Sequence, residues 1–145
     1  MNGKKDGHYK AVGSNGTRLV EGRYSNGVRV GHWTVFWPNG FQPYESGEFD
    51  NDGKKTGLWN ENEFNGRNIA HGYYHEDKKT GKWIYDKDSY NPKYYICGDE
   101  VTEREWNSHT KQQETLKRLA EFESNSKSDG MLSKIFKPLQ RIAIK

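Results

Sequence analysis

In Gly22-Arg23-Tyr24-Ser25-Asn26-Gly27-Val28-Arg29-Val30-Gly31-His32-Trp33, a Gly-x-aromatic triplet stands on either side of an Asn-Gly pair. Asn-Gly is typical of a tight turn between antiparallel strands, because both central residues of such a turn need a positive φ. The stretch therefore predicts a β-hairpin with one aromatic ring on each strand.

The same pattern returns along the chain with a period of about 25 residues. Gly-x-aromatic triplets begin at residues 7, 31, 57 and 81, and a second series begins at residues 22, 47 and 72. The fourth member of the second series, Gly98-Asp99-Glu100, lacks the aromatic residue. Turn signals keep the same register, at Asn15-Gly16, Asn39-Gly40, Asn65-Gly66 and Asn91-Pro92. Internal repetition of this length predicts an array of similar units, which we place at residues 7–30, 31–56, 57–80 and 81–99.

Each unit has two short strands, and alternate side chains of a strand point to opposite faces. The predicted fold is therefore mainly β, a single-layer, twisted antiparallel meander of about eight strands. We expect one face to carry an aromatic ladder, and the other face an apolar column. The ladder comprises Tyr9, Tyr24, Trp33, Phe49, Trp59, Tyr74 and Trp83, and the column comprises Leu19, Tyr44, Ile69 and Tyr95. The ladder is a candidate ligand surface, but packing between neighbouring repeats is the expected role.

The repeat also resembles the MORN repeat, and more closely its bacterial MORN-like variant, in the pattern Gly-x-Tyr-x-Asn-Gly-x-x-x-Gly-x-Trp of residues 22–33. The resemblance covers about residues 3–99 and departs from the usual pattern at Asp77, Asn91-Pro92 and Glu100. It implies tandem hairpins that make protein contacts, in some cases membrane contacts. The MORN-like variant occurs among antitoxin-type proteins.

The composition changes after Gly98. Thr102 and Glu105 have the spacing of a capping box, which predicts a helix that begins there and runs to about Glu123. We expect this helix, residues 100–123 with its connection, to cap the fourth repeat. Its sparse apolar stripe is Trp106, Thr110, Gln113, Leu116, Leu119 and Ala120.

Residues 124–145 are expected to form a flexible linker followed by a basic amphipathic segment. This segment has apolar residues at helical spacing, and Pro138 interrupts any single helix through it. Three roles remain open for it: a helix on a membrane surface, a ligand for a groove in a partner, or a segment that docks on its own sheet.

Bulk composition excludes several classes of protein. Of the 145 residues 31% are hydrophobic and 14% are aromatic, which fits turn-rich β structure with few but large apolar side chains. A net charge of +3 is too small to imply nucleic-acid binding. The chain shows neither a signal peptide nor a spanning segment of roughly 20 apolar residues, so a cytoplasmic location is expected.

No residue pattern points to catalysis or to a cofactor. The five histidines lack the spacing of a metal site, and Cys97 has neither a helix N-terminus nor a matched histidine to activate it. We therefore expect a protein that is not an enzyme and that holds no metal.

Two sets of residues are candidates for binding. Aromatic rings outside the ladder are expected to contact a partner protein, because a single-layer sheet cannot bury all of them. These are Phe36, Trp37, Tyr44, Phe64, Tyr73 and Tyr85. Basic residues at one repeat position and in the C-terminal segment are candidates for contact with anionic lipid, although edge lysines also prevent aggregation. These are Lys54, Lys55, Lys78, Lys79, Lys134, Lys137 and Arg141.

The sequence thus predicts a protein-binding scaffold that masks or inhibits a partner, as an antitoxin, an immunity protein or an inhibitor would. The alternative is a peripheral membrane adaptor that binds anionic lipid through the lysine-bearing turns and the basic C-terminal segment.

Overall fold

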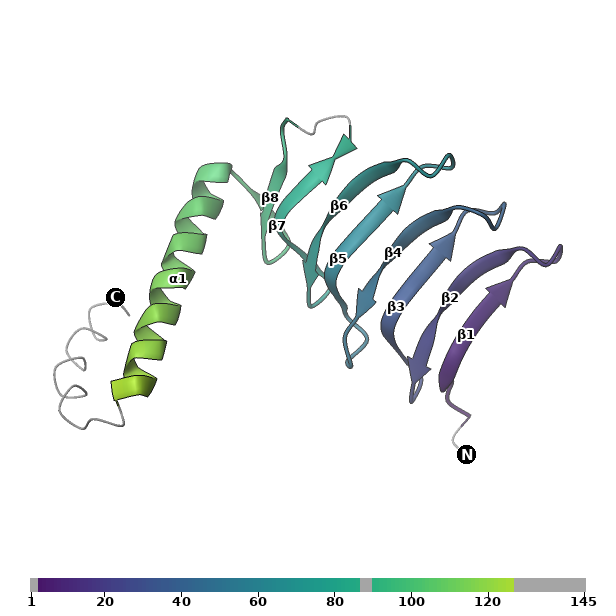
Figure 1. The fold of residues 1–145 in the computed structure, drawn as a ribbon, viewed down its shortest axis with the longest axis horizontal. Coiled ribbons are helices and arrows are strands. Elements are labelled where there is room, and N and C mark those ends of the chain that lie inside the picture. The colour runs from purple at the N-terminus through teal and green to yellow at the C-terminus, as the bar shows by residue number, and fades with distance from the viewer. Residues whose placement is uncertain (1–2, 87–89, 127–145) are drawn as a thin grey trace. The chain divides into compact units, whose positions relative to one another are not determined.

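A computed structural model describes residues 3–86 and 90–126 of the chain (Figure 1). One open antiparallel sheet has nine strands in chain order. The strands are β1 (Gly7–Val12), β2 (Arg18–Ser25), β3 (Val28–Phe36), β4 (Pro43–Phe49), β5 (Lys55–Asn62), β6 (Asn68–His75), β7 (Lys78–Tyr85), β8 (Lys93–Ile96) and β9 (Asp99–Val101), and the helix is α1 (Glu103–Ser126). The predicted fold class, a mainly β meander followed by a C-terminal helix, is confirmed.

The aromatic ladder forms on one face, which we call the ladder face. Each interior tryptophan lies between an aromatic ring on the preceding strand and another on the following strand. Trp59, for example, is 5.2 Å from Phe49 and 5.9 Å from Tyr74 between ring centroids, and both pairs are edge-to-face. Trp33, Trp59 and Trp83 are each at most 3% exposed. The core of this thin sheet is therefore a row of rings.

Glycines on β2, β4 and β6 make room for these rings. A Cβ atom placed on Gly22, Gly47 or Gly72 would lie only 2.1–2.3 Å from the nearest atom of the tryptophan on the next strand. The strand register shifts at each of these glycines, so that Gly22 faces Gly31-His32-Trp33 as a bulge. The Trp33 indole fills the bulge and its Nε1 donates to the Arg23 carbonyl at 3.1 Å. Sequence spacing and backbone irregularity thus have one cause, the space that a tryptophan ring needs.

The fourth repeat differs from the prediction in its register. Tyr95 lies opposite Gly81, as Tyr74 lies opposite Gly57, so Tyr95 belongs to the ladder and not to the column on the opposite face. The physical reason is the Cys97-Gly98 turn, whose φ angles of 51° and 96° match the 49° and 84° of Asn26-Gly27. Gly98 is therefore a turn residue, and the chain continues into a ninth strand beyond the expected eight.

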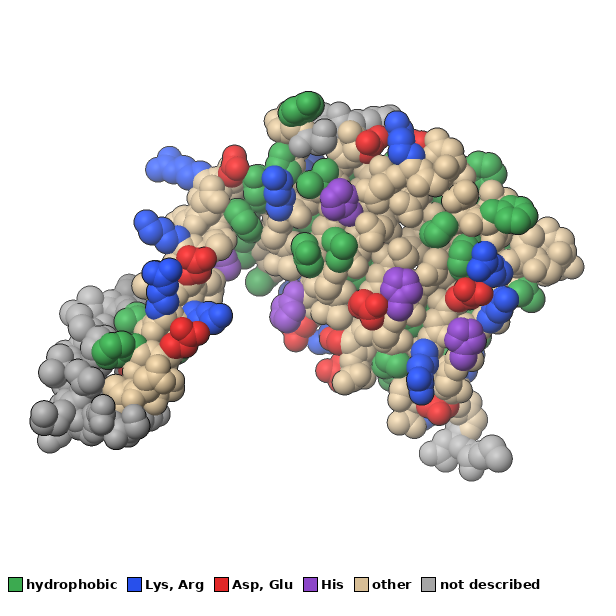
Figure 2. All heavy atoms as spheres, in the orientation of Figure 1, with side chains coloured by type: hydrophobic (Ala, Val, Ile, Leu, Met, Phe, Trp, Pro, Cys, Tyr) green, Lys and Arg blue, Asp and Glu red, His purple; other side chains and the backbone are tan. Residues whose placement is uncertain are grey.

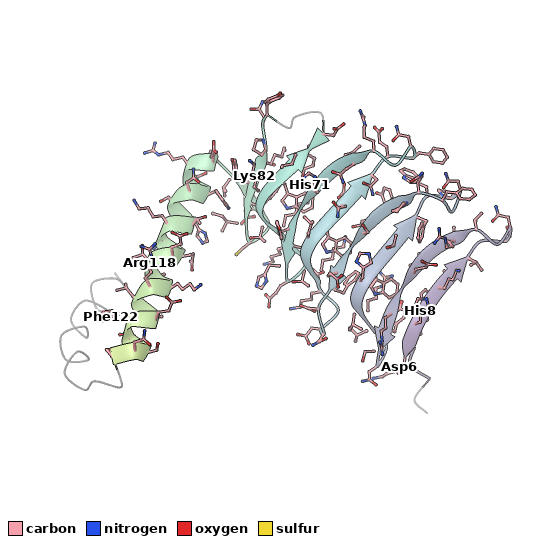
Figure 3. The ribbon with its side chains drawn as sticks, viewed as in Figure 1. Asp6, His8, His71, Lys82, Arg118 and Phe122 are labelled. Atoms are coloured by element: carbon pink, nitrogen blue, oxygen red, sulfur yellow. The ribbon has the colours of Figure 1, made fainter. Side chains whose placement is uncertain are left out.

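The opposite face is mostly polar (Figure 2), with histidine and charged side chains of both signs scattered over it. His8, His71 and Lys82 project from it (Figure 3). A half-buried row of small polar side chains crosses its centre, because Thr34, Ser46 and Asn60 lie opposite one another on neighbouring strands. This face carries no row of large rings comparable with the ladder.

Two compact units divide the chain between Trp106 and Asn107. The first unit contains the sheet and the first turn of α1, where the predicted capping box is present. The Thr102 backbone N–H donates to Glu105 Oε2 at 2.8 Å, and the Glu105 N–H donates back to Thr102 Oγ1 at 3.2 Å. The Trp106 ring lies 5.1 Å from the Tyr94 ring, at 35° between the ring planes, and the wider capping role of the helix stays a prediction.

The second unit contains the rest of α1, which continues to Ser126, three residues beyond the predicted end at Glu123 and into the predicted linker. Ser124 and Ser126 stabilise this last turn by donating to the carbonyls of Glu121 and Glu123. Leu116 and Phe122 are each 43% exposed on this unit. The proposed docking of its apolar stripe remains a prediction.

Replacing Gly47 by alanine tests the contact between glycine and tryptophan. The new Cβ would overlap the Trp59 ring, so we expect the free energy of unfolding to fall by about 3 kcal/mol in urea denaturation. Gly57→Ala is the control, because its Cβ meets no atom within 4 Å and only the positive φ of 65° is strained. This control should cost about 1–2 kcal/mol, and a larger loss for Gly57→Ala than for Gly47→Ala would contradict the assignment.

Truncating ladder rings tests how far stability depends on neighbouring repeats. Trp59→Ala removes a ring with aromatic neighbours on both sides and should cost about 3–5 kcal/mol. Tyr9→Ala should cost clearly less, because the aromatic neighbours of Tyr9 within the described residues, Tyr24 and Trp33, both come from strands on one side of it. Thermal unfolding of both variants measures the difference, and equal losses would argue against a linear array.

Candidate protein-binding surface

The turns that join the strands within the first three repeats lie side by side along one edge of the sheet, which we call the turn edge. Asn15, Asn39 and Asn65 each accept a bond from the backbone N–H two residues later. The glycine after each asparagine has a positive φ of 73–84°. A Cβ on Gly40 would lie 2.8 Å from Thr17, so the first two turns are in direct contact.

An aromatic cluster lies at the second and third turns. The Trp37 ring is 5.0 Å from Tyr44 and 6.1 Å from Phe64, both at 73° between ring planes. Trp37 Nε1 donates to the Asn62 carbonyl at 3.1 Å, which fixes the indole across two repeats. Phe64 is 59% exposed and Tyr44 is 41% exposed. Three of the six predicted partner-binding rings are thus brought together, on a rigid support.

Phe41 and Arg18 also lie at this edge, and neither was among the predicted partner-binding residues. Phe41 is 77% exposed, and it follows the Asn39-Gly40 signal directly in the sequence, which would have been enough to find it. The Arg18 guanidinium lies 4.6 Å above the Phe36 ring, so Phe36 is also at this edge but is covered. A cleft of about 230 Å³ is lined by residues of the first two turns, beside the point where they touch. It is lined by Asn15, Gly16, Thr17, Arg18, Asn39, Gly40 and Phe41.

The other two predicted rings lie elsewhere. Tyr73 is 54% exposed on the polar face, where it lies opposite Leu58, itself 44% exposed. Tyr85 was expected outside the ladder, but its ring is 6.3 Å from Trp83 and its hydroxyl is 3.4 Å from that of Tyr95. The expectation for Tyr85 is wrong, because Tyr85 follows Trp83 by two residues and so points to the same face.

The lysine pairs do not form a simple row along an edge. Lys55 Nζ lies 3.9 Å from the Trp59 ring centroid and pairs with Glu45, and Lys79 Nζ lies 4.1 Å from the Trp83 ring centroid. Lys54 is half-buried beside Asp50, and Lys78 is exposed. The second lysine of each pair therefore covers the ladder as a cation over aromatic rings. Lys134, Lys137 and Arg141 lie outside the described residues.

Burial on the ladder face raises the pKa of two tyrosines, and nearby charges and a hydrogen bond make smaller contributions. Burial raises the pKa of Tyr74 to about 12, with smaller contributions from Glu61 and Glu45. Burial and then the hydrogen bond with Tyr85 raise the pKa of Tyr95 to about 12. Lys79 Nζ donates to the Tyr85 hydroxyl at 3.0 Å and so connects these rings to the charge above them. Both phenols stay protonated over the physiological range.

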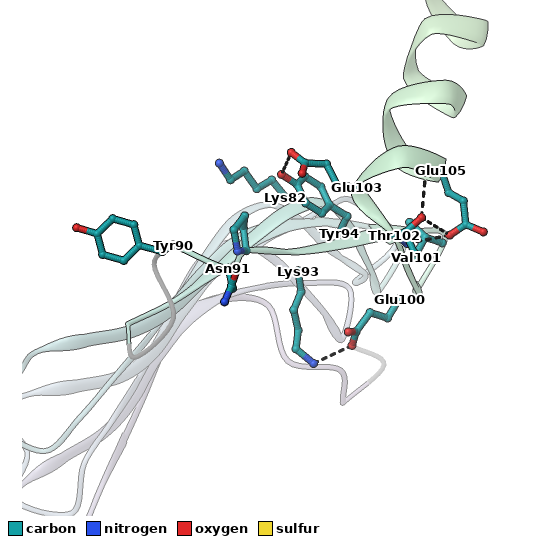
Figure 4. A pocket seen from close by; sticks show the side chains of 11 residues that line it. Lys82, Tyr90, Asn91, Lys93, Tyr94, Glu100, Val101, Thr102, Glu103 and Glu105 are labelled. Atoms are coloured by element: carbon teal, nitrogen blue, oxygen red, sulfur yellow. Dashed lines mark hydrogen bonds and ion pairs between the residues drawn. The ribbon is translucent and has the colours of Figure 1, made fainter.

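A larger cavity of about 780 Å³ lies at the end of the sheet, between β8 and the start of α1 (Figure 4). Its polar groups are engaged with one another. Lys93 donates to Glu100 at 2.9 Å, which raises the lysine pKa, and Tyr94 donates to Glu103 at 2.7 Å, which raises the tyrosine pKa. The Tyr94–Glu103 bond holds the start of α1 against β8, and the Lys93–Glu100 bond joins β8 to β9.

Two histidines of the sheet have a polar side chain within hydrogen-bond distance. His71 shares a hydrogen bond of 2.8 Å with Asn68, and His32 lies 3.1 Å from Glu48. Cys97 is exposed in the last turn of the sheet. Within residues 3–86 and 90–126, no group of three or more His, Cys, Asp or Glu side chains is placed to hold a metal ion.

Comparison of the chain with protein-family models, with curated proteins and with solved structures gives no match in any of the three. Within the described part of the chain, no helix is both long enough and apolar enough to span a bilayer.

The acidity of Tyr74 leads to a prediction about stability at alkaline pH. An unfolded tyrosine loses its proton near pH 10 and the folded Tyr74 near pH 12, so the free energy of unfolding is unaffected below pH 10 and falls from pH 10 to 12. Tyr74→Phe removes this contribution, and its unfolding free energy should fall less steeply than that of the wild type. Urea denaturation at pH 9 and pH 11 measures both slopes, and identical slopes would refute the prediction.

Proposed function

We propose that this protein is a non-enzymatic scaffold that binds a partner protein through its turn edge and thereby masks or inhibits that partner. The observation that carries the proposal is the cluster of Trp37, Tyr44 and Phe64 beside the exposed Phe41. Exposed aromatic clusters on a rigid support are the usual energetic centres of protein interfaces. The cleft between the first two turns adds a concave feature in which a partner side chain fits.

The construction of the sheet supports this role. The turns are held by backbone hydrogen bonds, such as those between Trp37 and Gln42 and between Glu63 and Arg67. Arg67 also pairs with Glu63 at 3.1 Å and Asp86 at 3.3 Å, which ties the third turn to the fourth repeat. A pre-formed surface loses little conformational entropy on binding, and this favours tight association with one partner.

We further propose that the chain is a cytoplasmic member of the MORN-like group and acts as an antitoxin-type or immunity-type protein would. The hairpin period and the glycine–tryptophan contacts support the proposal of a MORN-like repeat. A small scaffold that blocks its partner by covering it needs no catalytic group, which is consistent with the hydrogen-bonded histidines. The membrane-adaptor alternative gains no support from Lys55 and Lys79, whose charges lie over ladder rings.

The proposal is tested by replacing the exposed rings of the turn edge. Phe41→Ser with Phe64→Ser removes two rings that are mainly exposed, so the fold should be retained. Affinity capture from the native host, followed by titration of the purified partner, should show binding weakened more than about tenfold. The purified partner's own activity should fall when the wild-type chain is added and should not fall with the variant.

The matched control is Leu58→Ser with Tyr73→Ser, which removes two exposed apolar side chains from the polar face. This control should bind the partner as the wild type does. Loss of binding in the control with retention in the turn-edge variant would overturn the assignment of the surface. The membrane alternative would be favoured if no protein partner is found and the two variants behave alike in co-sedimentation with anionic vesicles.

A further inference from the structure

The two ends of the array are built differently, and the C-terminal end is closed. Lys93 lies opposite Trp83, where the earlier repeats have a glycine opposite their tryptophan. Any Cβ at that position would collide with a tryptophan from a following strand, as the 2.1–2.3 Å distances at Gly22, Gly47 and Gly72 show. Lys93 is also held by Glu100, and the chain leaves the sheet for α1 after Val101. No further repeat can be added at this end.

The N-terminal end is open by the same criteria. Gly7-His8-Tyr9 occupies the same repeat position as Gly31-His32-Trp33. In β3, that triplet lies opposite a glycine of the preceding strand, Gly22. Gly7 has a φ of 90°, in the same left-handed region as the 64° of Gly31. Among the described residues, β1 pairs with β2 alone, so the outer edge of β1 has no strand beside it.

The β2–β3 register shows what a complementary strand would contain. Glu21 lies opposite Thr34, Arg23 opposite Val30 and Tyr24 opposite Arg29. The positions in β1 and just before it that correspond to Thr34, Val30 and Arg29 are occupied by Lys10, Asp6 and Lys5. A strand that fits places glycine by Tyr9 and an aromatic ring by Lys5. Its acidic residue lies opposite Lys10, which also lies 3.6 Å from Glu21 of β2, and its basic residue lies opposite Asp6, which also accepts the Asn26 backbone N–H at 3.0 Å.

We propose that the outer edge of β1 is a second binding site, for an extended segment of a partner protein that reads acidic-Gly-basic-aromatic. The segment adds as an antiparallel strand, with main-chain hydrogen bonds that provide affinity and the glycine and charges that provide selectivity. The site continues the interface that already joins every pair of repeats. Within the part of the chain that the structure describes, a second copy offers only its own edge strand β1, which carries Gly7, or its C-terminal end, which carries Lys93. A dimer of the full chain in analytical ultracentrifugation would overturn the proposal.

The full chain can be tested with a capped synthetic peptide of residues 18–25, Arg-Leu-Val-Glu-Gly-Arg-Tyr-Ser. Amide chemical shifts should change at Gly7–Val12, and fluorescence anisotropy should give a saturable affinity. The same peptide with Gly22→Ala should bind at least about tenfold more weakly, because its Cβ meets the Tyr9 ring. Lys10→Glu in the protein should weaken the original peptide, and the peptide with Glu21→Lys should recover the loss.

Equal affinity for the glycine and alanine peptides would overturn the proposal, as would shift changes at β8 and β9 instead of β1. Binding that is seen only after removal of residues 127–145 would also overturn it, because the chain's own C-terminal segment would then be the occupant. The turn-edge variant Phe41→Ser with Phe64→Ser should bind the peptide normally. The proposals for the turn edge and for the β1 edge are therefore tested independently of each other.

Discussion

The contact between a tryptophan ring and a glycine on the preceding strand is the interaction on which the sheet depends. A thin sheet has no second layer to cover its apolar side chains, so its largest rings must be buried by its own backbone. Trp59 achieves this by lying over Gly47, while its Nε1 donates to the carbonyls of Glu48 and Thr56, both at 3.1 Å. The ring thus fills the bulge, and its buried N–H is satisfied by two backbone acceptors beside it.

The remaining features of the ladder follow from this contact. Rings on neighbouring strands meet edge-to-face, an arrangement that contributes about 0.5–1.5 kcal/mol for each pair beyond the buried area. Basic side chains then cover the exposed side of the rings, as Lys5 does over Tyr9 at 4.3 Å and Arg29 over Trp33 at 4.9 Å. The cation keeps its contact with water while its aliphatic stem shields the ring. One repeat position therefore needs a basic residue for a structural reason.

In a sheet stabilised in this way, the surfaces that remain accessible to a partner are the edges. The ladder face is occupied by its own cations, and much of the polar face is internally hydrogen-bonded. The turn edge is different, because turns of five or six residues tolerate side chains that point outward, such as Phe41 and Phe64. The end of the array at β1 is different as well, because the repeat interface there has only one of its two halves.

The sequence by itself determined the period, the turn positions, the aromatic ladder and the capping box, because each depends on residue types at short and fixed spacings. Only the tertiary structure decided that Tyr95 joins the ladder, since that depends on a Cys97-Gly98 turn with no sequence signal of its own, whereas the two-residue spacing of Trp83 and Tyr85 already placed Tyr85 on the same face. The tertiary structure also decided that Trp37, Tyr44 and Phe64 form one cluster while Tyr73 lies apart. Such proximity is set by cross-strand register and by which turns touch, and neither is encoded within a single repeat.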